Sequence, residues 1–169
     1  MECISERTVE QTWQTVADLA PDVAATEMMS FAARQPHLLG FVTAFLEELR
    51  DDANEMGTYL LFVVYKMFEN STTAEIPTVQ PDAIKDQYEA NQELLLDMET
   101  AADGGQAFED LAYLESLKHP WVFRYVTEVL LETDDDLPAD ERMSLSEEEI
   151  REVVILLKTV IDVLDEATN

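Results

Sequence analysis

The sequence predicts an all-α protein, a single helical bundle of about eight helices. Apolar residues recur at spacings of three and four, strand-like alternation of apolar and polar residues is rare, and the 169 residues include only four glycines. Prolines precede four of the apolar runs, and the first helical turn is where a helix tolerates proline. These helix starts are Pro21, Pro36, Pro81 and Pro120. The length is typical of one domain, residues 1–169.

Four helices are expected within the segment 1–70. The first spans 5–19, and the second and third follow the first two prolines. The fourth spans about 54–68 and contains seven consecutive apolar residues, 59–65, which is typical of a helix buried on most sides. Gly57 lies near its start, although glycine in a helix costs about 1 kcal/mol relative to alanine. A close crossing with another helix would explain this glycine.

Four more helices are expected after the polar segment 71–80, which we interpret as a surface linker. The fifth and the seventh begin at the last two of the four prolines, and the sixth is a short helix near 108–117. Asn91 lies on the apolar stripe of the fifth helix, so its amide should find a buried partner or face a groove. The eighth begins at Ser146, which is expected to form a capping box with Glu149.

Two segments of the chain resemble each other at an offset of 84 in the numbering. Pro36–Glu48 aligns with Pro120–Glu132, and each segment follows a polar residue and precedes an acidic stretch. One explanation is two pseudo-repeated halves, residues 1–70 and 81–169, which stack on each other and leave a groove. The other is a single bundle in which amphipathic helices that begin with proline are alike by chance.

The chain is strongly acidic but apolar enough to fold. It carries 37 acidic and 10 basic residues, a formal net charge of -27, and 47% of its residues are hydrophobic, which excludes a disordered acidic tail. The charge is -10 up to Ile84 and -17 from Lys85 onward. A binder of DNA or RNA needs a basic face, and an anionic membrane attracts basic segments, so neither partner is expected.

The compartment is expected to be the cytoplasm. The N-terminal segment lacks the cationic and apolar regions of a secretory signal. The longest apolar stretch is far shorter than the ~20 residues that cross a bilayer. The single cysteine, Cys3, excludes an internal disulfide framework and a cysteine-rich metal site.

A dense acidic cluster lies around the expected start of the fourth helix: Glu47, Glu48, Asp51, Asp52 and Glu55. On one continuous helix these like charges would stack at a spacing of four and destabilise it by about 0.2–0.5 kcal/mol per pair. Arg50, a helix break near Asp51, or a divalent cation could compensate. Glu48, Asp52 and Glu55 are the candidate ligands, because Mg²⁺ and Ca²⁺ prefer oxygen ligands. Solvated carboxylates without a ligand are the alternative.

A second acidic cluster follows the seventh helix and includes Asp134, Asp135 and Asp136. It does not match a calcium-binding EF-hand loop, since position six is Ala139 instead of glycine and position twelve is Leu145 instead of glutamate. We interpret it as an acidic turn. The candidates for contacts with a basic partner come from both clusters: Glu47, Asp51, Asp134, Asp135 and Asp136.

The motifs of common enzyme sites are missing. There is no glycine-rich phosphate loop, no Gly-x-Ser-x-Gly elbow and no Glu-x-x-His pattern. His37 and His119 lie at expected helix starts, where each is either a general base or metal ligand, or, as the sequence favours, a capping or partly buried aromatic group. The aromatic residues near helix starts are expected to be core rather than a ligand platform: Trp13, Phe41, Trp121, Phe123 and Tyr125.

The sequence therefore favours a non-enzymatic protein-interaction module of the adaptor or dedicated-chaperone type, without a cofactor. It would bind a partner protein through an apolar groove between helices or through an acidic face. One alternative is a hydrolase that depends on Mg²⁺ or Ca²⁺ and uses Glu48, Asp52 and Glu55. Another is a mimic of DNA, in which ordered carboxylates would imitate phosphates. The oligomeric state is left open.

Overall fold

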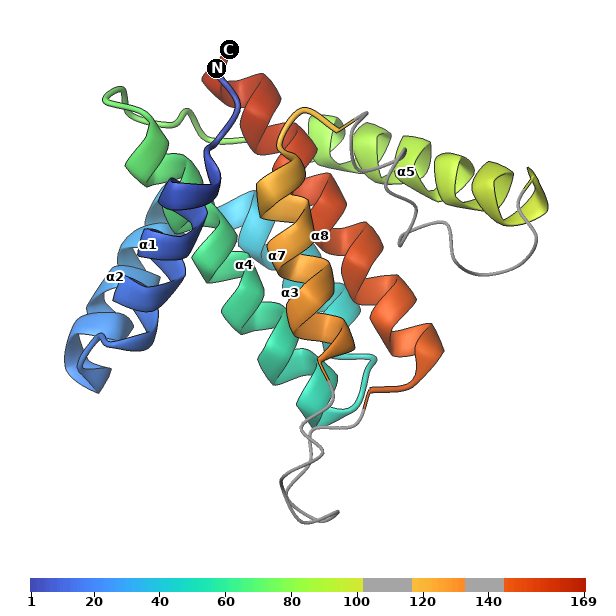
Figure 1. Cartoon of the computed structure of the whole chain (residues 1–169), viewed down its shortest axis with the longest axis horizontal. Coiled ribbons are helices and arrows are strands. Elements are labelled where there is room, and N and C mark those ends of the chain that lie inside the picture. Colours follow the sequence, from blue (N-terminus) through green and yellow to red (C-terminus); the bar gives the residue numbers. More distant parts are fainter. Residues whose placement is uncertain (102–116, 133–144) are drawn as a thin grey trace.

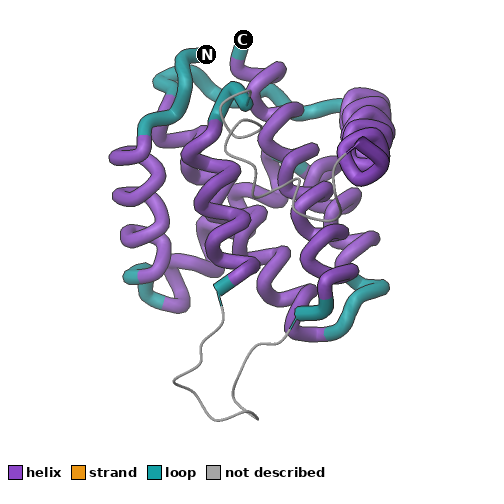
Figure 2. The backbone as a smooth tube through the Cα atoms, turned by 45° about the vertical axis from the view of Figure 1, so that its right-hand side comes forward, coloured by secondary structure: helices purple, strands orange, loops and turns teal. Residues whose placement is uncertain are grey.

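The computed structural model describes residues 1–101, 117–132 and 145–169, and within these residues it consists of seven helices and no strand (Figures 1 and 2). The helices are α1 (Glu6–Ala17), α2 (Pro21–Arg34), α3 (Pro36–Leu46), α4 (Asp51–Ser71), α5 (Pro81–Ala101), α7 (Pro120–Leu131) and α8 (Glu147–Thr168). The predicted all-α class is confirmed. Residues 108–116 of the predicted sixth helix and the cluster at 134–136 lie outside the described residues.

The helix starts follow the signals in the sequence. The four helices α2, α3, α5 and α7 each begin with the proline that predicts them. At α1, the side chain of Ser5 accepts a hydrogen bond from the backbone N–H of Thr8 at 3.2 Å. At α8, Ser146 and Glu149 form the predicted capping box, with both of its hydrogen bonds present. None of the described helices combines the length and the apolar character that crossing a bilayer requires.

A turn interrupts the helical structure between α3 and α4, at the acidic cluster around residues 47–55. Helix α4 begins at Asp51, three residues before the predicted start, and Asp51 and Asp52 occupy its first turn. The break takes Glu47 and Glu48 off the helix, and negative charge in the first turn is stabilised at a helix N-terminus, so less of the expected repulsion is left. Arg50, which precedes α4, binds Glu149 of α8 through Nε–Oε1 and Nη2–Oε2 contacts of 2.7 and 2.6 Å. The helix break therefore relieves part of the repulsion, whereas the ion pair of Arg50 is made with Glu149, outside the cluster.

The core forms around α4 and α8, which pack against each other. Four of their side chains are completely buried on facing helices: Leu60, Val64, Leu157 and Val160. Gly57 marks a close crossing of α3 and α4, as predicted, because a Cβ atom there would lie 2.6 Å from Leu46 Cδ2. This spacing explains why the chain accepts the cost of a glycine in a helix.

The helix contacts of the first half repeat in the second half. Helix α1 packs against α4 and α7, and α5 packs against α8 and α3. Likewise α3 packs against α4, and α7 against α8. At an offset of 96, which places Ala53 on Glu149, each buried residue of α4 falls on a buried residue of α8. If α1 is exchanged with α5, α3 with α7 and α4 with α8, the same pairs among these six helices are therefore in contact.

The residue before the proline of α3 binds the extended segment that precedes α5, and the residue before the proline of α7 binds the one that precedes α1. Gln35 accepts a hydrogen bond from the backbone N–H of Val79 at 3.0 Å and donates one to Pro77 O at 2.9 Å. His119, its counterpart before α7, accepts one on Nδ1 from the backbone N–H of Ile4 at 3.1 Å. Both side chains are buried. Since Val79 is also buried, the predicted surface linker is partly built into the core.

Candidate functional site

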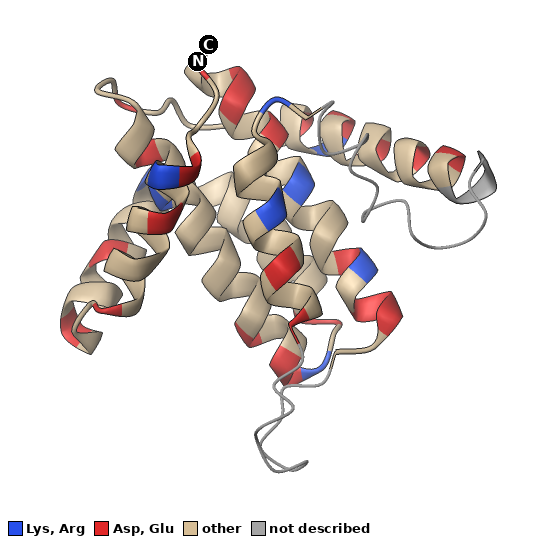
Figure 3. Ribbon diagram, viewed as in Figure 1, with Lys and Arg blue, Asp and Glu red and all other residues tan. Residues whose placement is uncertain are grey.

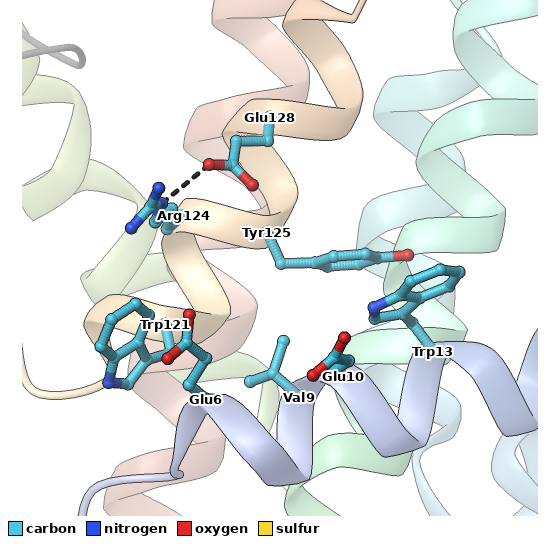
Figure 4. Close-up of a pocket in the computed structure, with 8 residues that line it drawn as sticks. All are labelled: Glu6, Val9, Glu10, Trp13, Trp121, Arg124, Tyr125 and Glu128. Carbon is cyan, nitrogen blue, oxygen red and sulfur yellow. Dashed lines mark hydrogen bonds and ion pairs between the residues drawn. The ribbon is translucent and has the colours of Figure 1, made fainter.

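A hollow of about 220 Å³ lies between α1 and α7 (Figure 4). Each helix contributes four residues at spacings of three and four, so that one face of each helix borders the hollow. We call this site the α1–α7 groove; it is lined by Glu6, Val9, Glu10 and Trp13 of α1 and by Trp121, Arg124, Tyr125 and Glu128 of α7.

Three aromatic side chains line the α1–α7 groove. The rings of Trp13 and Tyr125 are stacked, with centroids 6.4 Å apart and planes inclined by 17° (Figure 4). Trp121 lies a turn before Tyr125 on α7, and all three residues are half-buried. Burial raises the pKa of Tyr125, and the neighbouring Tyr59 raises it further, so the phenol is uncharged. The groove therefore presents neutral aromatic surface that is still reachable from outside.

Three exposed carboxylates border these rings, from Glu6, Glu10 and Glu128. The one cation among the lining residues is Arg124, whose Nε donates a hydrogen bond to Glu128 Oε1 at 2.7 Å. Its guanidinium carbon lies 5.7 Å from the ring centroid of Trp121. Acidic residues occur on every described helix except α3 (Figure 3), but here they are combined with indole rings.

The equivalent helix pair, α5 and α3, keeps the aromatic contact. Tyr88 corresponds to Trp13 at an offset of 75, and Phe41 corresponds to Tyr125 at an offset of 84. The ring centroid of Tyr88 lies 5.4 Å from that of Phe41 and 4.9 Å from that of Phe45. Tyr88 is only 7% exposed. The aromatic contact is therefore a packing element that both interfaces share.

The carboxylates are not shared between the two interfaces. At the offset of 75, α5 has Pro81 and Lys85 in the places of Glu6 and Glu10 of α1. At the offset of 84, α3 has Ala44 in the place of Glu128 of α7. A helix pair of this geometry therefore forms without them. The acidic rim of the α1–α7 groove is an addition that the packing does not require.

The predicted cation ligands lie around the break between α3 and α4. Glu48 is exposed in the turn after α3, Asp52 is half-buried in the first turn of α4, and Glu55 is exposed one turn later. Within residues 1–101, 117–132 and 145–169, no three His, Cys, Asp or Glu side chains come close enough to hold a metal ion together. Binding of Mg²⁺ or Ca²⁺ by these carboxylates stays a prediction.

The two histidines have different surroundings. His37 is exposed, whereas His119 is buried against Phe68. Because Nδ1 of His119 accepts the backbone N–H of Ile4, its proton lies on Nε2, 2.9 Å from Asp165 Oδ1. Burial alone would raise the pKa of Asp165, but hydrogen bonds from Lys118 and His119 outweigh it and lower this pKa. His119 is thus a buried cross-link between the N-terminal segment and α8.

The predicted buried partner of Asn91 is present. Its amide donates to Thr159 Oγ1 at 3.1 Å and to Asp162 Oδ2 at 3.0 Å, and it accepts from Lys158 Nζ at 3.1 Å. Lys158 also pairs with Asp162 at 2.7 Å. Among the described residues, every buried side-chain nitrogen or oxygen has a hydrogen-bond partner. This network joins α5 to α8.

Sequence reasoning missed the α1–α7 groove because it assigned Trp13, Trp121 and Tyr125 to the core. The available signal was an acid three or four residues from an aromatic on each helix, as in Glu10–Trp13 and Tyr125–Glu128. Aromatic faces and carboxylates both attract cations. The chain matches no protein-family model, no curated protein and no solved structure with which it was compared.

Proposed function

We propose that this protein is a non-enzymatic interaction module, of the adaptor or dedicated-chaperone type, that binds a basic segment of a partner protein in the α1–α7 groove. The observation that supports it is the set of three carboxylates around a hollow lined by aromatic rings. A lysine or arginine side chain there lays its charged end against an indole face and pairs with a carboxylate.

The size of the groove fits a side chain of a protein partner. Pockets for small molecules usually measure about 300–1,000 Å³. The hollow of about 220 Å³ is smaller and lies open on the surface between two helices. The net charge of -27 adds long-range steering of basic partners, which raises the association rate. Electrostatic steering and the lining of the groove therefore both favour a basic ligand.

Peptide binding tests the proposal. The probe is a fluorescein-labelled peptide in which lysine and arginine alternate with glycine, and fluorescence anisotropy reports its binding. We expect the double variant Glu6→Gln, Glu10→Gln to bind it about threefold to tenfold more weakly, since each exposed ion pair contributes about 0.2–1 kcal/mol. Raising the NaCl concentration should weaken binding further, because salt screens exposed charges.

The matched control removes two charges from the equivalent helix α5. Glu89 and Glu93 are exposed and spaced by four, like the two carboxylates of α1. Glu89→Gln, Glu93→Gln should change binding less than about twofold, since it only reduces the screened overall charge. An equal loss in both double variants would contradict the proposal, as would a failure of the probe to bind.

A third double variant addresses the site expected from the sequence. If Glu47→Gln, Glu48→Gln weakens binding and the groove variant does not, the partner binds at the turn between α3 and α4, and the proposed groove is wrong. The cation-dependent hydrolase built on Glu48, Asp52 and Glu55 and the DNA mimic stay predictions from the sequence.

A further inference from the structure

We infer that the cation which enters the α1–α7 groove is the guanidinium of an arginine of the partner, and that it takes the place of Arg124 over the ring of Trp121. This inference rests on the proposed function and names the residue that the groove recognises. It also assigns Arg124 a role as an internal competitor of the partner.

The free protein already holds a guanidinium in this position. Arg124 lies over Trp121 with 5.7 Å between its guanidinium carbon and the ring centroid, and it pairs with Glu128 at 2.7 Å. A guanidinium is planar, stacks on aromatic rings and offers five N–H donors in a fixed fork, whereas an ammonium is a compact, strongly hydrated charge. The distance and the pairing therefore suit arginine better than lysine.

Arg124 is held weakly enough to be displaced. Its side chain is 53% exposed and that of Glu128 is 62% exposed. Exposed ion pairs contribute little because water and salt screen them, and an arginine before its glutamate is the less favourable order on a helix. Glu6 of α1 and Glu128 of α7 border the same groove (Figure 4), so an incoming guanidinium meets carboxylates of both helices. Arg124 forms its ion pair within its own helix, with Glu128, and Glu6 of α1 attracts it only at longer range.

The equivalent helix shows that this arrangement is not needed for packing. At an offset of 84, α3 has His37, Gly40 and Ala44 in the places of Trp121, Arg124 and Glu128. A Cβ atom at Gly40 would meet nothing within 4 Å, so a side chain at this position faces open space. Of these two equivalent helices, only the one that borders the groove carries the indole, the guanidinium and the carboxylate together.

The test compares two unlabelled peptides of equal length and charge by isothermal titration calorimetry, one with arginine alternating with glycine and one with lysine alternating with glycine. The wild-type protein should bind the arginine peptide more tightly. Arg124→Ala and the longer Arg124→Gln should both bind it about twofold to fivefold more tightly, because neither the weak internal pair nor a like charge then opposes the ligand.

The control is Lys85→Ala on α5, which removes a cation that is 70% exposed and pairs with Glu89 at the same spacing of four. It should change the affinity less than about twofold, since its charge is distant and screened. Two results would overturn the inference: equal binding of both peptides, or Arg124 variants that bind the arginine peptide no more tightly than Lys85→Ala does. In both cases the peptide still binds, so the proposed function is still supported. If neither peptide binds the wild-type protein, the proposed function itself fails.

Discussion

The α1–α7 and α5–α3 helix pairs occupy equivalent places in the two halves but present different surfaces. Between α5 and α3, Tyr88 is buried against Phe41 and Phe45. Between α1 and α7, Trp13 stacks on Tyr125 but stays half-exposed, beside a hollow with an acidic rim. The comparison separates what the fold needs, an aromatic contact at each pair, from what only one pair carries, the carboxylates and the arginine.

The largest expected difference between the two pairs is in stability. Tyr88→Ala should lower the free energy of unfolding by about 3–5 kcal/mol, because it empties a buried aromatic site. Trp13→Ala should cost about 1–3 kcal/mol, since its half-exposed ring buries less area. Urea unfolding followed by circular dichroism measures both. If Trp13→Ala costs as much as Tyr88→Ala, the groove is a packing element like its counterpart.

The buried side chains before α7 and α3 form the next comparison. His119→Ala should cost about 2–4 kcal/mol, because it leaves the backbone N–H of Ile4 without an acceptor and removes a ring packed against Phe68. Gln35→Ala should cost about 1–3 kcal/mol through the orphaned N–H of Val79. Thermal and urea unfolding give both values. The exposed His37→Ala is the control and should stay within about 0.5 kcal/mol of the wild type; similar losses in all three would argue against the buried cross-links.

The ion pair that joins the starts of α4 and α8 predicts a pH dependence. The hydrogen bond from Arg50, and then that from the backbone of Ser146, lower the pKa of Glu149 to about 2. The carboxylate of Glu149 therefore stabilises the fold above its unfolded pKa of about 4.3, and this contribution is lost as the pH falls toward 2. Glu149→Gln, which can still form the capping box, should cost about 2 kcal/mol at neutral pH.

The check is urea unfolding of both proteins across this range. The difference between wild type and Glu149→Gln should be constant above about pH 5 and should shrink as the pH falls toward 2. A difference that does not change with pH would show that the charge of Glu149 is not what Arg50 recognises.

The smallest expected effect is a gain in stability at Gly40, the counterpart of Arg124. Gly40→Ala should stabilise the protein by about 0.5–1 kcal/mol, because alanine favours the helix and meets no neighbour there. Gly57→Ala is the contrasting variant, since its Cβ would clash with the buried Leu46 and should lower stability. Differential scanning calorimetry measures the two shifts. A loss at Gly40 would mean that this face of α3 is packed, contrary to the comparison with α7.

Local signals in the sequence predicted the local structure. Proline at the first helical position fixes where α2, α3, α5 and α7 begin, and the hydroxyl of Ser146 and the carboxylate of Glu149 cap α8. The buried amide of Asn91 and the close crossing at Gly57 also followed from position on a helix face. Each of these features depends on residues within a few turns of each other or on one apolar stripe.

The α1–α7 groove could not be predicted in this way, because it depends on which helices become neighbours. Glu10 and Arg124 border the same hollow, although they lie far apart in the sequence. The apolar stripe of a helix shows which face is buried but not against which partner. The internal similarity was visible only at the offset of 84, since the offsets of 75 for α1 and α5 and of 96 for α4 and α8 differ with the connecting segments.

The two tryptophans of the chain, Trp13 and Trp121, both line the α1–α7 groove, which makes their indole N–H signals direct reporters of it. Trp13→Phe and Trp121→Phe assign the two signals. In a ¹H–¹⁵N titration with the peptide of arginine alternating with glycine, we expect both signals to shift along one saturable curve. Glu89→Gln, Glu93→Gln should change the affinity from that curve less than about twofold, and Glu6→Gln, Glu10→Gln should weaken binding about threefold to tenfold. Binding of the peptide without a shift of either indole signal would contradict the account.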